Sequence, residues 1–284
     1  MKYPLQLRIP EFFLNKKIEE FLLEDAPQGD ITTSPIFEFP KRITAKIAAK
    51  EELVFAGEQI IEHFFRDSFD VEIHYDDGIV VPKNSVLATI AGAADKILTR
   101  ERVLLNLLQR TCGIATLTKK YVDIAKPYKV MILDTRKTTP GLRFFEKFAV
   151  AVAGGFNHRL NLSSGILIKD NHIVAAGGIT QAVERIKLMK YALPVELEAE
   201  NLEQIKEGLE AGIDGILLDN MQPKDARVAV EFIRTHKRGS DIFIEASGGI
   251  NLSNIEDYCK TGVDAVSVGA LTHSYKSSDI SMDF

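Results

Sequence analysis

Residues 195–220, VELEAENLEQIKEGLEAGIDGILLDN, contain the pattern that decides the fold. Two short apolar runs, 195–197 and 216–218, enclose an amphipathic segment at 202–211. Gly212 follows that segment, as glycine commonly does where a helix ends. A strand, a helix and a second strand of these lengths predict a parallel βαβ unit.

The same alternation recurs through the second half of the chain. Short apolar runs lie at 130–133, 166–168, 195–197, 216–218, 242–244 and 265–268. Amphipathic segments lie between the later runs, at 179–191, 202–211, 223–235 and 253–261. Repeated units of this kind predict a parallel α/β barrel. Six visible strands fall short of eight, so we expect an incomplete barrel.

The first part of the chain has a different pattern, typical of an α+β domain. We expect helices at 10–25 and 59–65 and strands at 42–50, 71–75 and 86–90. Asp77-Gly78 predicts a tight turn between the last two strands. From residue 95 the pattern becomes helical, with Val103, Leu104, Leu107 and Leu108 on one apolar face.

Composition narrows the class of function. The net charge of -5 argues against nucleic acid as a partner, because such proteins usually present a broad basic face. The two cysteines, Cys112 and Cys259, have no partner at metal-ligand spacing, which fits a reducing cytoplasm. No apolar run approaches the roughly 20 residues that span a bilayer, so we expect no membrane partner.

Polar residues follow each apolar run, where the carboxyl ends of barrel strands converge on the active-site face. The basic ones are Arg136, Lys137, His158, Arg159 and Lys169. Arginine holds planar carboxylates through two parallel hydrogen bonds, whereas lysine acts as a movable point charge. This basic set predicts a site for a small, rigid polyanion with two carboxylates.

Two further groups complete the predicted site. Glu198 and Asp219 are its acidic members, able to bind Mg²⁺ or to stabilise positive charge on a sugar; the alternative is a structural ion pair with Lys169 or Lys137. Glu196 is expected in the opposite register of its strand, away from the site. A phosphate grip after the last two strands is predicted from glycine-rich turns, whose residues are Ser247, Gly248, Gly249, Gly269 and Ala270.

These motifs, taken together, resemble one known family. They are DTRKTTPGLR (134–143), GGFNHR (154–159), LIKDNH (167–172), LLDNM (217–221), EASGGI (245–250) and SVGALTHS (267–274). Glu101-Arg102, Asn106, GIAT (113–116) and GDIT (29–32) match upstream. The chain is similar, over nearly its whole length, to the quinolinate phosphoribosyltransferase family.

The resemblance implies the architecture. It implies an N-terminal α+β open sandwich, residues 1–110 joined by the tail 271–284, and an open, seven-stranded α/β barrel at 111–270. It also implies a homodimer, or an assembly of dimers up to a hexamer, in which the sandwich of one subunit covers the barrel of its partner. Arg102 would then reach into the partner's site and bind quinolinate, although its helix position alone predicts only a solvated side chain.

The resemblance also assigns roles. Arg136, Lys137, His158, Arg159 and Lys169 would bind quinolinate, and both lysines would also touch phosphoribosyl pyrophosphate. Glu198 and Asp219 would serve the ribose and Mg²⁺–pyrophosphate, and the glycine-rich turns the 5′-phosphate. The catalytic residues would be Lys137, Lys169, Glu198 and Asp219, with Mg²⁺ as the cofactor. Ser164 and Cys112 depart from the usual aspartate and serine, which puts only local packing or assembly in doubt.

Two alternatives stay open on sequence grounds. One is a related transferase of this fold that acts on another base, such as a molybdenum-locus homologue, whose arginines around the base would differ. The other is a barrel lyase that forms a Schiff base through Lys137 or Lys169.

Overall fold

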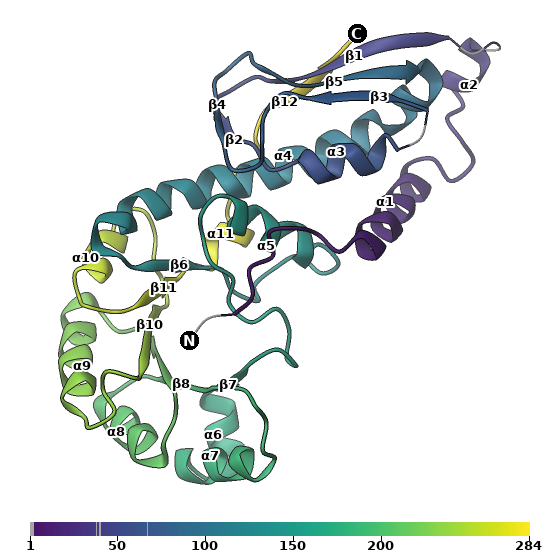
Figure 1. Cartoon of the computed structure of the whole chain (residues 1–284). Coiled ribbons are helices and arrows are strands. Elements are labelled where there is room, and N and C mark those ends of the chain that lie inside the picture. Colours follow the sequence, from purple (N-terminus) through teal and green to yellow (C-terminus); the bar gives the residue numbers. More distant parts are fainter. Residues whose placement is uncertain (1–2, 38, 40, 67) are drawn as a thin grey trace. The chain divides into compact units, whose positions relative to one another are not determined.

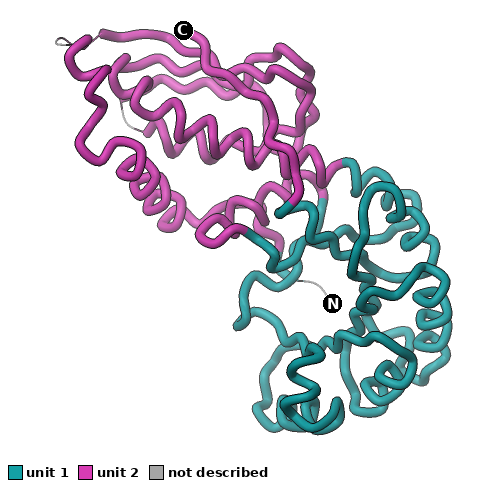
Figure 2. The backbone as a smooth tube through the Cα atoms, turned by 180° about the vertical axis from the view of Figure 1, so that it is seen from behind, with its two compact units in different colours: residues 1–4, 120–138, 155–273 teal, residues 5–119, 139–154, 274–284 magenta. Residues whose placement is uncertain are grey.

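The computed structural model describes residues 3–37, 39, 41–66 and 68–284. These residues form two compact units (Figure 2). The barrel unit contains residues 3–4, 120–138 and 155–273, and the sandwich unit contains residues 5–119, 139–154 and 274–284.

The barrel unit contains a parallel sheet with open edges. Its strand order is β6-β11-β10-β9-β8-β7, and every neighbouring pair is parallel. The strands are β6 (Met131–Leu133), β7 (Ile166–Ile168), β8 (Val195–Ala199), β9 (Gly215–Asp219), β10 (Phe243–Ser247) and β11 (Ala265–Ser267). The predicted seventh strand was wrong for the described residues, because only a single parallel bridge, between Leu133 and Phe156, occupies its place.

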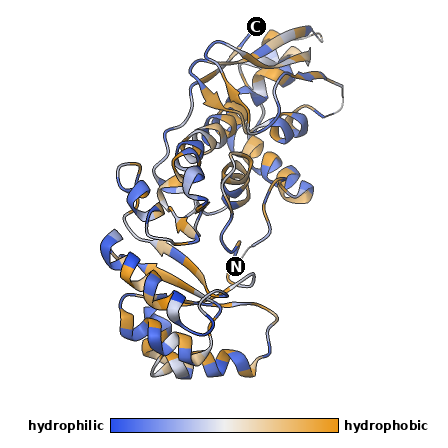
Figure 3. Ribbon diagram, turned by 60° about the vertical axis from the view of Figure 1, so that its left-hand side comes forward, coloured by the Kyte–Doolittle hydropathy of each residue, from blue (hydrophilic) through white to orange (hydrophobic). Residues whose placement is uncertain are grey.

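Helices lie outside the curved sheet (Figure 1). They are α6 (Asp170–Ala176), α7 (Ile179–Leu188), α8 (Leu202–Ala211), α9 (Pro223–Thr235) and α10 (Ile255–Cys259), and there is a short 3₁₀ turn, η1 (Lys126–Tyr128). The short helix α11 (Ala270–His273) follows β11 at the carboxyl end of the sheet. Local signals fix α8: Asn201 accepts a hydrogen bond from the Gln204 backbone at one end, and Gly212 adopts a left-handed conformation at the other. Apolar residues concentrate in the strands and on the inward faces of the helices (Figure 3).

The sandwich unit is built on an antiparallel sheet of order β12-β1-β5-β3. Its strands are β1 (Arg42–Ala49), β3 (Asp70–Ile73), β5 (Val86–Ala93) and β12 (Ile280–Asp283), and a separate pair is formed by β2 (Leu53–Val54) and β4 (Val80–Val81). Its helices are α1 (Glu11–Asp25), α2 (Thr33–Ile36), α3 (Glu58–Phe64), the first part of α4 (Ala94–Ala125), and α5 (Arg143–Val152).

The compact units divide the chain differently from the predicted boundaries: residues 111–119 and 139–154 lie in the sandwich unit, and residues 3–4 and 271–273 lie in the barrel unit. An ion pair with a buried carboxylate holds residues 139–154 in the sandwich unit. The Glu146 carboxylate, with its side chain at 0% exposure, accepts a hydrogen bond of 2.5 Å from Nη2 of Arg110 on α4, and its other oxygen accepts the Thr139 backbone N–H at 3.2 Å. The tail 274–284 also belongs to this unit and contributes β12.

The predicted fold class and most predicted elements are confirmed. All six apolar runs of the barrel are strands, and the segments 202–211 and 223–235 coincide with α8 and α9. The predicted turn at Asp77-Gly78 is present, and β5 returns antiparallel to β3, but the short strand β4 between the turn and β5 was not predicted. Among the helices that the structure describes, none is long and apolar enough to cross a membrane.

Candidate active site

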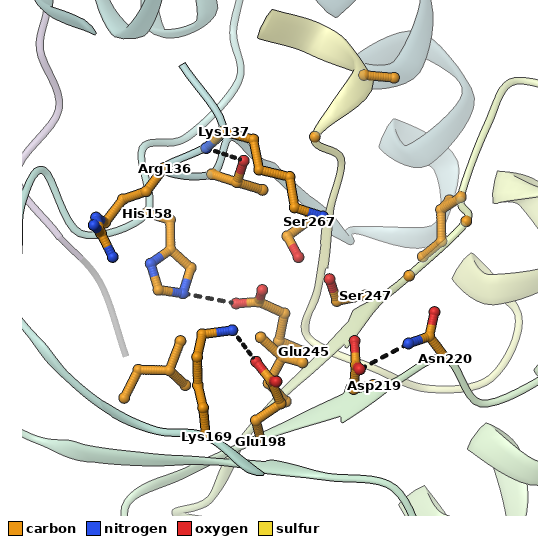
Figure 4. Close-up of a pocket in the computed structure, with 18 of the residues that line it drawn as sticks. Arg136, Lys137, His158, Lys169, Glu198, Asp219, Asn220, Glu245, Ser247 and Ser267 are labelled. Carbon is orange, nitrogen blue, oxygen red and sulfur yellow. Dashed lines mark hydrogen bonds and ion pairs between the residues drawn. The ribbon is translucent and has the colours of Figure 1, made fainter. Parts of the chain in front are cut away.

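A cavity of about 690 Å³ opens at the carboxyl ends of the barrel strands. Its lining includes Arg136, Lys137, His158, Arg159, Lys169, Glu198, Asp219, Ser247, Gly248, Gly249, Gly269 and Ala270. The predicted residues of the barrel therefore come together around one space, although they are spread over more than 130 positions of the sequence. Figure 4 shows that Arg136 and His158 lie on one side of this space and Asp219 and Ser247 on the other.

Alternation along the strands places these side chains. Side chains two residues apart on a strand share a face, and the cavity is lined by Leu167 and Lys169 at the end of β7, by Leu217 and Asp219 on β9, and by Glu245 and Ser247 on β10. In each pair the first residue lies deeper and the second at the rim. The rim residues are polar because they face the space in which a ligand would bind.

Two guanidiniums form the centre of the basic wall. Burial and the neighbouring charge of Arg136 lower the pKa of Arg159, whose residue is 5% exposed. Nη1 of Arg159 donates to the Gly165 carbonyl at 3.1 Å, and Nε of Arg136 is buried without a hydrogen-bond partner among the described residues. Two neighbouring positive charges and a buried donor without a partner lower the stability of the folded protein. An anion bound between the two guanidiniums would offset this loss of stability.

Asp134 fixes the loop that carries this wall. It follows β6 and is completely buried. Its Oδ1 accepts the His158 backbone N–H at 2.8 Å, and its Oδ2 accepts the Asn157 side-chain N–H at 2.6 Å. Charge-assisted hydrogen bonds of this kind are stronger than neutral ones, so the acidic residue of the DTRK motif positions the NHR motif.

Lys169 joins the basic wall to the acidic one. Its ammonium pairs with the Glu198 carboxylate from the neighbouring strand β8 (Figure 4). The backbone N–H of Lys169 donates to Nδ1 of His172 at 3.0 Å, which caps the start of α6. His172 is therefore a hydrogen-bonding support for the start of this helix.

Asp219 and the glycine-rich turn beyond β10 are connected by Asn220. The Asn220 side chain donates to Oδ2 of Asp219 at 2.7 Å, and its backbone N–H donates to the Ser247 carbonyl at 2.9 Å. Gly248 has a φ of +100°, and a Cβ there would lie 2.2 Å from Oδ1 of Asn220. Only glycine permits this close approach.

Lys137 lies against the last turn of the barrel. Its carbonyl accepts the Thr272 hydroxyl at 2.7 Å, and a Cβ on Gly269 would lie 3.1 Å from its Cδ. The turn at Gly269 thus holds the Lys137 stem close to α11.

Three buried titratable groups lie together in the barrel interior, of which His158 and Glu245 line the cavity and Glu196 contacts His158. Nε2 of His158 lies 3.3 Å from Oε2 of Glu196 and 3.6 Å from Oε2 of Glu245. The Arg159 backbone N–H donates to Nδ1 of His158 at 2.7 Å, so the ring carries its proton on Nε2 and is neutral in this arrangement. Burial raises the pKa of Glu196 to about 8 and that of Glu245 to about 7.

The prediction that Glu196 points away from the site was wrong. Glu196 and Glu198 are two residues apart on β8 and share a face, and Glu196 lies in the barrel interior beside His158. Sequence reasoning missed Ser267 in the lining, and it gave no role to Glu245 and Asn220, which belong to the polar segments that follow apolar runs and line the cavity. The period of two would have singled out Glu245 and Ser267, since each precedes a predicted phosphate-grip residue by two positions.

Arg102 lies outside this cavity, on α4 in the sandwich unit. Its side chain is 60% exposed, and its guanidinium lies 3.9 Å from the Glu101 carboxylate. This exposed position matches the pattern-based expectation of a solvated residue and leaves its predicted role in a partner's site a prediction.

Comparison with known proteins identifies the family. Residues 30–112 match the model of the quinolinate phosphoribosyl transferase N-terminal domain, and residues 114–283 match that of the C-terminal domain. The chain belongs to the quinolinate phosphoribosyltransferase family. The family resemblance found in the motifs is thereby confirmed.

Relatives of this family match the chain from end to end. A probable nicotinate-nucleotide pyrophosphorylase [carboxylating] of Bacillus subtilis is 42% identical, over 95% of this chain and 93% of its own length. The nicotinate-nucleotide pyrophosphorylase [carboxylating] of Mycobacterium leprae is 40% identical, over 94% of this chain and 95% of its own. The solved structure of the nicotinate-nucleotide pyrophosphorylase of Francisella tularensis is 35% identical, covers 99% of both chains and superposes with a TM-score of 0.92.

Proposed function

We propose that this family member transfers the phosphoribosyl group of 5-phosphoribosyl 1-pyrophosphate to quinolinate and removes one carboxylate. The products would be nicotinate mononucleotide, CO₂ and pyrophosphate, in NAD biosynthesis. One observation carries the proposal: a single cavity has a wall with two neighbouring guanidiniums, Arg136 and Arg159, and an opposite side with two carboxylates, Glu198 and Asp219. The first suits a dicarboxylate and the second a sugar with its metal-bound pyrophosphate.

Arg136 and Arg159 would bind the two carboxylates of quinolinate. Paired N–H donors on each guanidinium match the two oxygens of a carboxylate. The ligand would also supply the missing partner of the buried Arg136 Nε. His158, neutral in the hydrogen-bonding arrangement described, would contribute packing and orientation rather than charge.

The 5′-phosphate of the donor would bind the glycine-rich turns, where Ser247, Gly248, Gly249, Gly269 and Ala270 line the cavity. Glycine lets backbone N–H groups approach phosphate oxygens closely. Such sites are common after the last strands of α/β barrels. Lys137 lies beside this turn, where its charge would meet the phosphates of the donor.

Glu198 and Asp219 fit Mg²⁺ as residues that hold it directly or through water. They lie on neighbouring strands at the rim of the cavity, and carboxylate oxygen is the donor that Mg²⁺ prefers. The contacts with Lys169 and Asn220 engage one oxygen of each, and each carboxylate has a second. When bound, Mg²⁺ would neutralise charge on the leaving pyrophosphate.

Chemistry would then follow from position and charge. The lone pair of the pyridine nitrogen forms the bond to C1 of the ribose, and the bond from C1 to the pyrophosphate oxygen breaks with its electrons on oxygen. The Glu198 and Asp219 carboxylates stabilise the positive charge that develops on the sugar. The C2 carboxylate next leaves as CO₂, and the electron pair left at C2, beside the cationic nitrogen, takes up a proton from water. The lysines offset repulsion between the two anionic substrates.

We further propose a homodimer with shared sites, assembled from such dimers up to a hexamer, in which Arg102 enters the partner's cavity. Its exposure on α4 supports this, since an arginine with an accessible guanidinium is available to a partner. We also propose a cytoplasmic location. Both cysteines are free and buried, as expected in a reducing compartment.

The activity can be tested with purified protein, Mg²⁺, phosphoribosyl pyrophosphate and either quinolinate or nicotinate. We expect nicotinate mononucleotide from quinolinate only. Turnover with nicotinate but not with quinolinate would favour a transferase for another base. Borohydride trapping of a carbonyl substrate on Lys137 or Lys169 would favour the lyase; we expect none, because the Lys169 amine is engaged by the Glu198 carboxylate.

A further inference from the structure

Tyr3 belongs to the barrel unit and lies behind the basic wall. Its ring packs against that of His158, with a centroid distance of 5.1 Å and an interplanar angle of 31°. This spacing is within the range in which aromatic pairs contribute more than the area they bury. Tyr3 is not in the lining of the cavity, so it would act on a ligand only through the residues it touches.

The Tyr3 ring also lies close to Gly165. A Cβ on Gly165 would lie 2.6 Å from Cε1 and 2.8 Å from the hydroxyl oxygen of Tyr3. The backbone of Gly165 is not in the left-handed region that favours glycine. Glycine is therefore required here by the Tyr3 ring, and not by the backbone conformation.

Gly165 also connects Tyr3 to the guanidinium wall. Its carbonyl accepts the Nη1 hydrogen bond of Arg159 at 3.1 Å. A single ring thus contacts His158 directly and supports Arg159 through the residue that holds its guanidinium. Burial and the Glu196 and Glu245 carboxylates raise the pKa of Tyr3, while Arg159 lowers it, so the neutral phenol lies within the field of all these groups.

This support acts on a part of the barrel that has few strand contacts among the described residues. β6 and β7 are the two edges of the sheet, and the loop with His158 and Arg159 runs between them. Within the described residues, the strand contacts of this loop are reduced to the bridge from Phe156 to Leu133. Its position therefore depends on side-chain contacts such as those of Asp134 and Tyr3.

We propose that Tyr3 is a positioning residue of the dicarboxylate pocket: its ring, seated on Gly165 and against His158, holds the loop that presents Arg159. The inference rests on the proposed function and deepens it. It assigns Tyr3 to the affinity for the base, and not to the sugar donor, whose predicted contacts lie across the cavity.

Steady-state kinetics of Tyr3→Ala, Tyr3→Phe and the matched control Tyr191→Ala would test this in the full chain. Tyr191 is in the same unit but 58% exposed. We expect Tyr3→Ala to raise KM for quinolinate about tenfold or more, because small displacements of a binding group are costly. KM for phosphoribosyl pyrophosphate should change less than about twofold. Tyr3→Phe keeps the ring, so its KM values for both substrates should be close to those of the wild type. The same is expected of Tyr191→Ala.

A double-mutant cycle with Gly165→Ala separates positioning from general damage. Gly165→Ala alone should raise KM for quinolinate as Tyr3→Ala does, because the new methyl group displaces the ring. In the Tyr3→Ala background, Gly165→Ala should raise KM for quinolinate by less than about a further twofold, since the effects of substituting two residues in contact are not additive. Thermal unfolding of each variant reports whether it folds; if Tyr3→Ala does not, Tyr3→Phe with Gly165→Ala supplies the comparison.

Three results would each overturn the inference. The first is a Tyr3→Ala enzyme whose KM values for both substrates equal those of the wild type. The second is a rise in both KM values alike, and the third is a double variant whose KM for quinolinate rises by the product of the two single effects. Each of these leaves wild-type turnover of quinolinate intact. A wild-type protein without that turnover would instead mean that the proposed function fails.

Discussion

Lys169 is the residue at which the two sides of the cavity meet. Its ammonium lies in the basic wall and pairs with Glu198. Lys169→Ala should lower kcat/KM by about 10²–10³-fold, the usual cost of removing one preorganised electrostatic group. The kcat/KM of Lys169→Arg should lie between those of the wild type and Lys169→Ala, because arginine keeps the positive charge but has a differently shaped head group. Lys224→Ala, an exposed lysine on α9, is the control. Full activity of Lys169→Ala in the steady state would contradict this role.

Glu245 should make stability depend on pH. Burial raises its pKa in the folded protein from 4.5 to about 7, so the folded state binds the proton more tightly than the unfolded chain. Its contribution to stability is complete below about pH 4.5 and is lost as pH rises through about 7. Glu245→Gln should therefore reduce the fall in Tm between pH 5 and pH 8 by roughly 5 °C.

Calorimetry at the two pH values measures this effect. Glu231→Gln, an exposed residue on α9, should keep the wild-type pH dependence. The pKa of Glu196 is also raised in the folded protein, so Glu245→Gln should weaken the pH dependence of Tm and not abolish it. An unchanged or steeper fall in Tm for Glu245→Gln would show that Glu245 is ionised in the folded protein.

Residues differ in how far the sequence alone predicts their place. Arg136, Lys169 and Asp219 were predicted at the cavity because each follows an apolar run, and parallel strands bring such positions to one face. Glu196 was assigned to the wrong face of its strand. The sequence pattern was unambiguous, since residues two apart on a strand share a face and Glu196 is two residues from Glu198. Tyr3 had no local signal at all, because its contact with His158 joins residues more than 150 positions apart.

Among the elements, the turn after β10 allows the most direct test. Gly248→Ala would force a Cβ against Asn220 and should raise KM for phosphoribosyl pyrophosphate about tenfold or more, with KM for quinolinate little changed. Gly177→Ala is the matched control. Gly177 also has a positive φ, +89°, but nothing lies within 4 Å of its would-be Cβ, so only stability should fall, by about 1 kcal/mol. Equal kinetic effects of both substitutions would contradict the assignment of this turn.

Elements with local signals were predictable, and those made by distant pairing were not. α8 has capping residues at both ends, α9 begins at Pro223, and both have apolar stripes, so they lie where the sequence predicts. β4 is a two-residue strand that exists only through its pairing with β2, and α5 is held by Arg110 from α4. The seventh strand also depends on pairing, since Phe156 makes a single bridge, to Leu133, within the described residues.

At the scale of the whole molecule, the shared-site proposal predicts complementation between subunits. Arg102→Ala and Lys169→Ala homodimers should each have strongly reduced activity. Co-expressed in equal amounts, they should regain up to about a quarter of the wild-type activity, because half of the dimers would contain one intact site and one doubly altered site. No recovery in dimers verified to contain both subunits would contradict a site that takes Arg102 from the partner.

The central claim is that this cavity couples phosphoribosyl transfer to decarboxylation of quinolinate. Quinolinate labelled with ¹³C in the carboxylate at C2 tests it most directly, with the protein, Mg²⁺ and phosphoribosyl pyrophosphate in one vessel. We predict one labelled CO₂ for each nicotinate mononucleotide formed, and no labelled CO₂ when phosphoribosyl pyrophosphate is left out. Label retained in the nucleotide product, or released without the donor, would contradict the account.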